Sequence, residues 1–339
     1  MKKISILIPC YNEAENVVPM TEAVRTVMAE QLADYETELV FIDNCSTDGT
    51  RDLLRVLCAK YENVRAILNA KNFGQFNSPF YGMCQLDGDC VITICCDFQD
   101  PVELIPQFVE KWEQGYKIVS GIKNASKEGR IMRSLRTLYY KTIRKMSDVE
   151  QIEHFTGSGL YDRAFLDVLK DLDDPTPFLR GIVAELGFRR CDVPYEQQRR
   201  RAGKTHNNFF SLYDAAMLSV TSYTKVGLRV ATIAGFILSA VSLLVALFYL
   251  ILKLFWWNEF PAGMAPVLIG VFVFGSVQLF FIGLMGEYIM SINKRVMHRP
   301  LVIEEERLNF CRENDPDGKS GKSGKSEKDE KGGKSQKSE

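Results

Sequence analysis

Two long uncharged stretches near the C-terminal end constrain this chain more than any other feature. Residues 230–252 contain no charged side chain, and neither do residues 262–286. A helix of about 20 apolar residues is long enough to cross the roughly 30 Å hydrocarbon core of a bilayer. We therefore expect two transmembrane helices, at 230–252 and 262–289. The alternative is a pair of buried helices within a soluble domain.

The residues around these stretches predict which side of the membrane each end faces. The joining segment, 253–261, carries only two charged residues and holds large aromatic residues typical of a membrane interface: Trp256, Trp257 and Phe260. Basic residues flank the stretches on their outer sides: Lys225, Arg229, Lys294, Arg295 and Arg299. The positive-inside rule then places the N-terminal part and the C-terminal tail in the cytoplasm, with 253–261 as a short external loop.

The N-terminal part alternates short apolar runs with stretches of helical spacing. The expected strands are 4–9, 38–43, 64–68 and 90–96. The expected helices are 13–32, 50–61 and 77–86. This alternation predicts an α/β fold with a mainly parallel sheet and helices on both faces. In such sheets ligands bind beyond the carboxyl ends of the strands, which is where polar residues follow Pro9, Asp43 and the 90–96 run.

The pattern continues less regularly toward the apolar stretches. We expect a strand at 116–121, a basic helix at 130–147, helices near 163–171 and 177–187, and a strand at 190–194. A basic, glycine-containing loop follows at 196–206. Residues 207–225 have helical spacing, and they fit an interfacial helix on the bilayer and an ordinary core helix equally well.

The chain thus divides into seven parts. We expect a catalytic domain (1–205), a juxtamembrane segment (206–229), a first span (230–252), an external loop (253–261), a second span (262–289), a cytoplasmic segment (290–313) and a tail (314–339). The tail repeats Gly-Lys-Ser and contains no apolar residue, so we expect it to be disordered.

Charge and cysteine content exclude some classes of protein. The formal net charge of −1 gives no support to nucleic-acid binding. Nine cysteines and three histidines include no CxxC pair and no zinc-ligand spacing. Reduced thiols are the expected state, as in a protein whose polar part faces the cytosol.

The sequence Asp97-Phe98-Gln99-Asp100-Pro101 directly follows an apolar strand. A carboxylate with a carboxamide two residues on is able to hold Mg²⁺ or Mn²⁺, which would neutralise a diphosphate leaving group. The alternative is that Asp97 or Asp100 caps the next helix. Asp43 ends another strand and is able to contact a ribose or a base, or simply to form a turn.

Several arginines offer bidentate contacts to phosphate groups: Arg130, Arg133, Arg136, Arg199, Arg200 and Arg201. The alternative for each is a solvated surface charge.

Taken together, the motifs resemble a known family. IPCYNEAENV, IDNCSTDGT, NFGQ and DFQDP are similar to motifs of the inverting family 2 glycosyltransferases with the GT-A fold. VPYEQQRRRAGKTH, TSYTKVGLRVATIAGF and the later GEYI and RVMHRP resemble its polyprenyl-phosphate branch, of the bactoprenol-phosphate glucosyltransferase and dolichol-phosphate mannosyltransferase type. The resemblance extends from Lys3 to Pro300.

The resemblance implies a role for individual residues. The residues implied in nucleotide binding are Pro9, Tyr11, Glu13 and Asp43. Asp97 and Gln99 are implied as metal ligands. Arg200 matches the arginine of an R-x-x-G loop, implied in catalysis and in binding the acceptor phosphate, and Arg133 is a looser match to an acceptor-binding arginine.

The sequence departs from the family pattern at four positions. Cys95 stands where the first acid of a D-x-D motif is expected, Asn44 replaces a second aspartate, and Gln75 replaces a lysine. Ser158 replaces an acid, which leaves Asp162 as the nearest candidate base. A metal site with fewer carboxylates should be weaker, or should depend more on the donor diphosphate.

The expected activity is metal-dependent transfer of a hexose from a UDP- or GDP-linked sugar to a polyprenyl phosphate, with inversion. Such a product would serve cell-envelope or polysaccharide glycosylation at the bacterial inner membrane. The first alternative, a processive polysaccharide synthase, lacks support because two spans make no pore and the QxxRW signature is absent. The second is a catalytically inactive scaffold that binds nucleotide-sugar. A homo-oligomer is compatible with the sequence.

The predicted topology puts Cys311 on the cytoplasmic side of the membrane. A membrane-impermeant thiol reagent added to intact cells should therefore leave Cys311 unlabelled, and permeabilised cells should show labelling. Labelling of Cys311 from outside intact cells would contradict the predicted topology.

Overall fold

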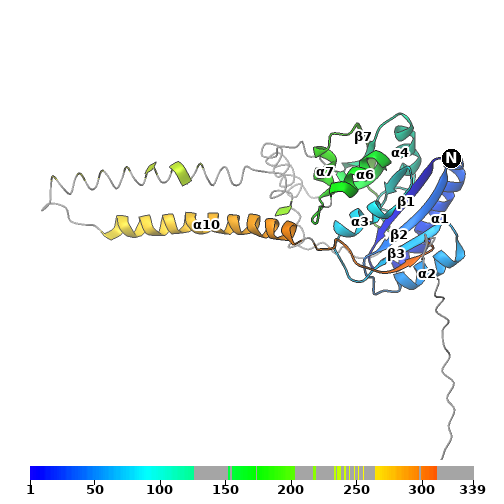
Figure 1. The fold of residues 1–339 in the computed structure, drawn as a ribbon, viewed down its shortest axis with the longest axis horizontal. Helices are drawn as coiled ribbons and strands as arrows, with labels where there is room; N and C mark the ends of the chain where they lie inside the picture. The colour runs from blue at the N-terminus through cyan, green and yellow to red at the C-terminus, as the bar shows by residue number, and fades with distance from the viewer. Residues whose placement is uncertain are drawn as a thin grey trace, which may run out of the picture. The chain divides into compact units, whose positions relative to one another are not determined.

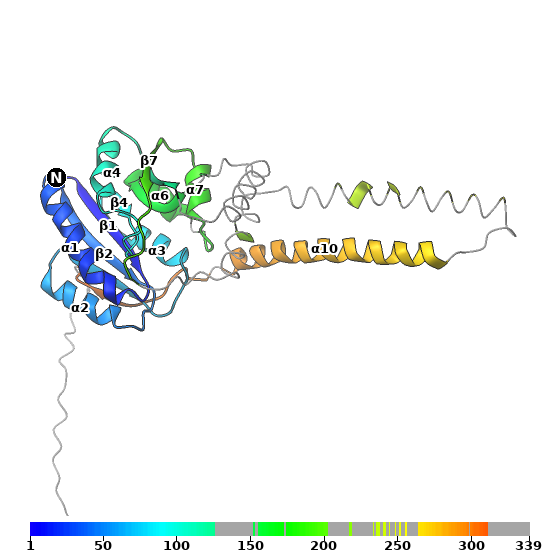
Figure 2. The ribbon, with the colours of Figure 1, turned by 180° about the vertical axis from the view of Figure 1, so that it is seen from behind.

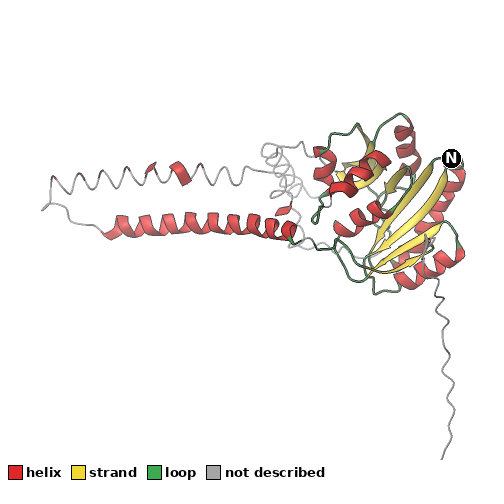
Figure 3. Cartoon of the chain, in the orientation of Figure 1, coloured by secondary structure: helices red, strands yellow, loops and turns green. Residues whose placement is uncertain are grey.

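The computed structural model describes residues 1–125, 152, 155–172, 174–202, 264–297 and 299–310, with isolated residues between 217 and 255. Figures 1 and 2 show the chain from two opposite sides, and Figure 3 distinguishes its helices from its strands. The predicted basic helix (130–147), the segment 207–225, most of the first predicted span and the tail lie outside the described residues.

The described strands form one sheet. They are β1 (Lys3–Cys10), β2 (Glu36–Asp43), β3 (Val64–Asn69), β4 (Cys90–Thr93), β5 (Ile118–Ala125), β6 (Phe155–Asp162), β7 (Arg190–Glu196) and β8 (Glu304–Leu308). Their order in space is β7-β5-β6-β4-β1-β2-β3-β8. The β1–β2, β1–β4, β2–β3 and β5–β7 pairs are parallel, so the predicted α/β fold with a mainly parallel sheet is confirmed.

Parallel pairing brings three strand ends together. In the register of β1, Cys10 lies opposite Asp43 of β2 and Leu7 lies opposite Thr93 of β4. The loops that follow β4, β1 and β2 therefore all leave the sheet at the carboxyl ends of its parallel strands, as the sequence predicts.

Helices cover both faces of the sheet. They are α1 (Ala14–Gln31), α2 (Thr50–Lys60), α3 (Asn77–Gln85), α4 (Leu104–Glu113), α6 (Arg163–Leu172) and α7 (Leu179–Glu185). Helix α1 contacts both α2 and α4, whereas α3 contacts α6. The predicted helices of this region are confirmed to within a few residues at each end.

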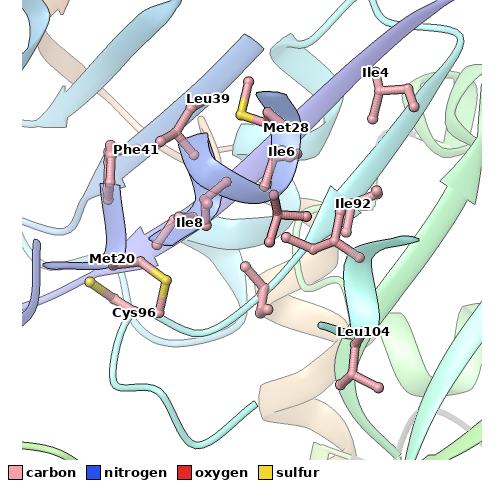
Figure 4. Packing of buried hydrophobic residues seen from close by; sticks show 14 of the residues in the cluster. Ile4, Ile6, Ile8, Met20, Met28, Leu39, Phe41, Ile92, Cys96 and Leu104 are labelled. Atoms are coloured by element: carbon pink, nitrogen blue, oxygen red, sulfur yellow. The ribbon is translucent and has the colours of Figure 1, made fainter. Parts of the chain in front are cut away.

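The alternation of side chains along β1 shows how the two layers are held. Ile6 and Ile8 point to the face covered by α1 and belong to one buried cluster with Met20 (Figure 4). Leu7 points to the other face, where a Cβ added at Gly82 of α3 would lie 3.1 Å from its Cδ1. Because both faces are covered, β1 reads as a continuous apolar run.

Strand β6 lies inside the sheet, between β5 and β4, yet its sequence lacks the apolar run that would predict a strand. Its two glycines, Gly157 and Gly159, read as turn residues. A Cβ added at Gly159 would lie 2.3 Å from the carbonyl oxygen of Val119 in β5, so only glycine fits this close approach of two backbones.

Strand β8 joins the sheet from the far end of the chain. It pairs antiparallel with β3, and both strands lie side by side in Figure 1, where β8 is orange. The predicted catalytic domain ended at residue 205, so its sheet takes a further strand from beyond that boundary.

Helix α10 (Met264–Val296) covers the second predicted span. Among the described residues it is the one helix long and apolar enough to cross a membrane, over Val273–Val296. Its 33 residues extend about 50 Å, and apolar side chains such as Leu279 and Ile289 are more than half exposed. The first predicted span stays a prediction.

Candidate active site

The candidate site lies where β4, β1 and β2 end. Each of the three following loops contains one non-glycine residue with left-handed backbone: Phe98 (φ 59°), Asn12 (φ 56°) and Cys45 (φ 65°). Such a conformation costs on the order of 1–3 kcal/mol and tends to occur at ligand sites. The shared backbone feature is therefore a reason to treat the carboxyl ends of these strands as the candidate site.

The loops after β1 and β2 are bonded to each other. The Thr47 amide donates to Asn12 Oδ1 at 2.8 Å, and the Asn12 amide donates to Ser46 Oγ at 2.8 Å. The Ala14 amide at the start of α1 donates to Asp48 Oδ2 at 3.1 Å. These contacts join the two loops into one unit and set a negative charge at the helix N-terminus, where it is stabilising.

Asp43 is a buried carboxylate at the end of β2. It accepts hydrogen bonds from the amide of Ser46, at 3.0 Å, and from its hydroxyl, and it forms an ion pair with Arg51 Nε at 3.2 Å. Burial raises the pKa of Asp43, while the Ser46 hydrogen bonds and the Arg51 charge oppose that rise. A desolvated carboxylate of this kind is a strong acceptor for a hydroxyl donor.

Asn44 explains one departure from the family pattern. Its Nδ2 donates to Asn72 Oδ1 at 2.9 Å and to the Gly74 carbonyl at 3.3 Å, while its Oδ1 accepts from the Phe73 amide at 2.9 Å. An aspartate could not make the two donor contacts. Asn44 therefore holds the 72–74 loop against the end of β2.

Asp97 and Arg200, two of the residues predicted for the site, form an ion pair. Asp97 is 5% exposed and its Oδ2 receives Arg200 Nη2 at 2.8 Å and Nε at 3.0 Å. Backbone hydrogen bonds run from Gln198 to the Gln99 carbonyl at 3.0 Å and from Arg201 to the Asp97 carbonyl at 3.3 Å. The basic loop therefore lies directly on the turn that carries Asp97.

Glu13 shares the electrostatic field of this pair. Burial raises the pKa of Glu13, a hydrogen bond from Asn16 opposes the rise, Asp97 adds to it and Arg200 lowers it. The structure thus brings Glu13, Asp97 and Arg200 to one place, with Asp43 on the neighbouring strand.

Asp100 has a role that sequence reasoning missed. It is buried and accepts hydrogen bonds from Ser158 Oγ of β6 and Tyr195 OH of β7. The alternative, that Asp97 or Asp100 caps the next helix, is wrong, because the N-cap of α4 is Glu103 and no side chain caps that helix. Asp100 instead connects the turn that carries Asp97 to strands β6 and β7 through these two hydrogen bonds. Its only sequence signal was a second acid directly after the predicted metal motif.

Cys95 lies beside this cluster, with its Sγ 4.0 Å from Ser158 Oγ. Although the residue has exposed surface, desolvation of the thiol and the charges of Asp100 and Asp97 raise its pKa well above the ordinary value. Without a bound cation the thiol is therefore protonated at neutral pH, and thiol sulfur suits Mg²⁺ less well than carboxylate oxygen does.

The residues fit a divalent cation only in part. No group of three His, Cys, Asp or Glu residues able to hold a metal occurs in the described part of the chain. Asp97 Oδ1 accepts the Gln99 amide at 3.1 Å and retains a second lone pair. Mg²⁺ is commonly held by one or two carboxylates and completed by substrate phosphates, and one carboxylate at this strand end meets that requirement.

Asp162 does not join the site. It lies opposite Cys90, at the start of β4, about 10 Å before that strand ends. There it accepts Trp112 Nε1 at 2.7 Å and Lys117 Nζ at 3.1 Å. Asp162, the candidate base from the sequence, therefore lies at the amino end of β4, away from the site, because β6 runs antiparallel to β4. There it has a structural role as the acceptor for Trp112 and Lys117.

The remaining predicted residues are placed as follows. Pro9 pairs with Ile42 in the β1–β2 ladder, and Tyr11 is half-buried just after β1. Arg133 lies outside the described residues.

The fold is α/β, and the candidate site lies at the carboxyl ends of its parallel strands. Residues 5–169 match the family model "Glycosyl transferase family 2". The "Bactoprenol glucosyl transferase" of Shigella phage SfV is 32% identical over 307 residues, which are 90% of this chain and 99% of that protein. The chain belongs to glycosyl transferase family 2 and is a glycosyltransferase.

Other relatives match over similar lengths. The "Prophage bactoprenol glucosyl transferase homolog" of Escherichia coli K12 is 30% identical, covering 89% of this chain and 98% of its own length. A solved structure of the mannosyltransferase PcManGT from Pyrobaculum calidifontis, titled as a complex with GDP-Man and Mn²⁺, is 16% identical with a TM-score of 0.42, covering 85% and 87%.

The hydrogen bonds that Asp100 accepts from Ser158 and Tyr195 predict that Tyr195→Phe destabilises the protein. Removing the hydroxyl leaves a buried carboxylate oxygen without its donor, which should lower the free energy of unfolding by about 1–3 kcal/mol. Chemical denaturation of the full-length protein in detergent measures the change. An unfolding midpoint equal to that of the wild type would contradict the proposed role of the Tyr195 hydroxyl.

Proposed function

We propose that this glycosyltransferase moves a hexose from a nucleotide-sugar to a polyprenyl phosphate at the cytoplasmic face of the membrane. The observation that carries the proposal is the near full-length match to proteins named for bactoprenol. A match over 307 of 339 residues cannot be confined to the 5–169 region that the family model covers. The similarity therefore extends into the C-terminal half of the chain, which contains α10.

The pairing of β8 with β3 supports a membrane-anchored arrangement. If α10 crosses the bilayer, β8 follows that crossing, yet it shares a sheet with the N-terminal strands. A chain that returns to its starting side must cross an even number of times. The predicted span at 230–252 supplies the second crossing, and the basic flanks favour the cytoplasm for the sheet.

The proposed reaction needs charge control more than a strong base. A phosphate monoester has a second pKa of about 6, so the acceptor oxygen is already anionic at neutral pH. It attacks the anomeric carbon as the bond from that carbon to the diphosphate oxygen breaks, which inverts the configuration. The position of Asp162, away from the site, is compatible with a reaction that removes no proton.

The chain's own residues have distinct tasks in this proposal. Asp43 and Glu13 hold the nucleoside part of the donor, with Pro9 and Tyr11 lining the pocket. Arg200 leaves Asp97 to stabilise the negative charge that develops on the leaving diphosphate. Asp97 and Gln99 would hold Mg²⁺ or Mn²⁺, which supplies further positive charge for the diphosphate. Arg133 is retained as an acceptor-binding residue.

A turnover assay tests the proposal. Purified full-length protein is incubated with a polyprenyl phosphate and a panel of UDP- and GDP-linked sugars, and released nucleoside diphosphate is measured. Release that requires the lipid phosphate supports the proposal. Nucleotide binding without release would favour the inactive scaffold, and a polymeric product would favour the synthase.

Replacing Asp97 with alanine should reduce turnover by about 100-fold or more, because it removes the strand-end carboxylate that faces Arg200. Asp192→Ala is a matched control, since Asp192 pairs with Arg190 at 3.0 Å on the exposed face of β7. Both variants should remain folded, and only the first should lose activity. Near-normal turnover in a folded Asp97→Ala variant would remove Asp97 from the site.

The Arg200→Lys variant separates a phosphate clamp from a membrane anchor. Lysine keeps the charge but lacks the planar fork, so we expect turnover to fall by about 10- to 100-fold while partitioning into vesicles is unchanged. Arg190→Lys serves as the control. A silent Arg200→Lys substitution would show that only the charge of this residue matters.

A further inference from the structure

The strand that follows the membrane helix reaches the nucleotide side of the sheet. Residues 297–303 join the end of α10 to β8. The Ala70 amide donates to the Ile303 carbonyl at 2.9 Å, just beyond the end of β3. At the other end of β8, Asn309 Nδ2 donates to the carbonyls of Val64, at 2.9 Å, and Tyr61, at 3.2 Å. Both ends of β8 are thus fixed to the domain.

One side chain connects β8 to the site. Arg51, in the first turn of α2, forms an ion pair with Asp43 in which Nε lies 3.2 Å from Oδ2. Its Nη2 donates to the Asn69 carbonyl at 3.0 Å and to Glu305 Oε2 of β8 at 2.9 Å. The Arg51 side chain is 18% exposed and Asp43 is fully buried. The guanidinium is therefore held between a buried carboxylate at the strand end and an acid on the edge strand.

We propose that Glu305 is a positioning residue for the nucleotide site. It fixes the orientation of Arg51, and Arg51 in turn holds and neutralises Asp43, so the strand attached to the membrane helix sets the affinity for the donor nucleotide. The proposal rests on the proposed function, since it takes Asp43 to contact the nucleoside.

The geometry determines the expected direction of the effect. The two acceptors at Nη2 hold the guanidinium beside Asp43, where its positive charge neutralises the carboxylate as an ion pair, without a hydrogen bond from Nε. Without Glu305 the Asn69 carbonyl alone restrains that side, and Arg51 has more freedom to turn toward solvent. Asp43 then lies buried with weaker neutralisation, and it presents a less ordered acceptor to the nucleoside. Because Glu305 is half exposed, the effect on affinity should be modest, about two- to fivefold.

The neighbouring residue provides a matched control. Glu306 is also on β8, and it pairs with Arg55 of α2 at 2.9 Å. Arg55 in turn pairs with Asp52 at 2.8 Å. Among the described contacts, neither Arg55 nor Asp52 touches Asp43. Glu305→Gln and Glu306→Gln therefore each remove one ion pair between the same two elements, and only the first leads to the site.

The experiment measures the dissociation constants of UDP and GDP for the full-length protein in detergent by calorimetry, together with donor KM and kcat. Glu305→Gln should raise the dissociation constant and KM of the preferred nucleotide and its sugar about two- to fivefold, with kcat unchanged. Glu306→Gln should match the wild type. Both variants should have the same unfolding midpoint.

An Arg51→Met background tests whether Glu305 acts through Arg51. In that background Glu305→Gln should cause no further loss of nucleotide affinity. Equal affinities of the two glutamine variants, or a Glu305→Gln effect that persists without Arg51, would overturn the proposal while leaving the transferase activity standing. A wild-type protein that binds neither UDP nor GDP would overturn both the proposed function and this inference.

Discussion

The parallel pairing of β1 with β2 and β4 is the constraint on which the rest of the structure depends. It brings the carboxyl ends of three strands together, and each strand is followed by a loop that contains a residue with left-handed backbone. The apolar runs that make these strands are buried on both faces, so their positions are set by core packing. The positions of Asp43 and Asp97 are well defined for the same reason, because Asp43 ends one of these buried strands and Asp97 closely follows another. A site on such strand ends needs little reorganisation when charge develops on a ligand.

Core strands and the charged residues at their ends were predictable from the sequence because the signal is local. β1 to β4 are short, largely apolar runs, and the Asp97 and Arg200 motifs were recognisable as sequence strings. β6 was not predicted because its glycines serve a close backbone contact with β5, which no local pattern records. β8 was not predicted because Glu304, Glu305 and Glu306 read as a solvated segment, although charged side chains are typical of an edge strand.

Roles that depend on distant partners were also beyond the sequence. Asp162 was misplaced because its position follows from the antiparallel register of β6. In the sequence, Asn44 stood out only as the replacement of an expected aspartate. The structure shows that its amide donates to Asn72 Oδ1 and to the Gly74 carbonyl, which a carboxylate could not do. Asp100 required the hydroxyls of Ser158 and Tyr195, which come from two other strands. In each case the chemistry of the residue was visible, but the partner was far away in the chain.

The place of β8 at the sheet edge also orders the events of folding. During synthesis the N-terminal strands emerge first, and the partner of β3 emerges only after the whole of α10. The contacts that close this edge, such as Arg51 with Glu305, join residues 254 positions apart, and contacts of such long range form late. Until then β3 presents an unpaired edge that is able to pair with another chain. Completion of the catalytic sheet thus depends on prior synthesis of the long apolar helix α10, which makes formation of the finished sheet one of the last steps in the folding of the enzyme.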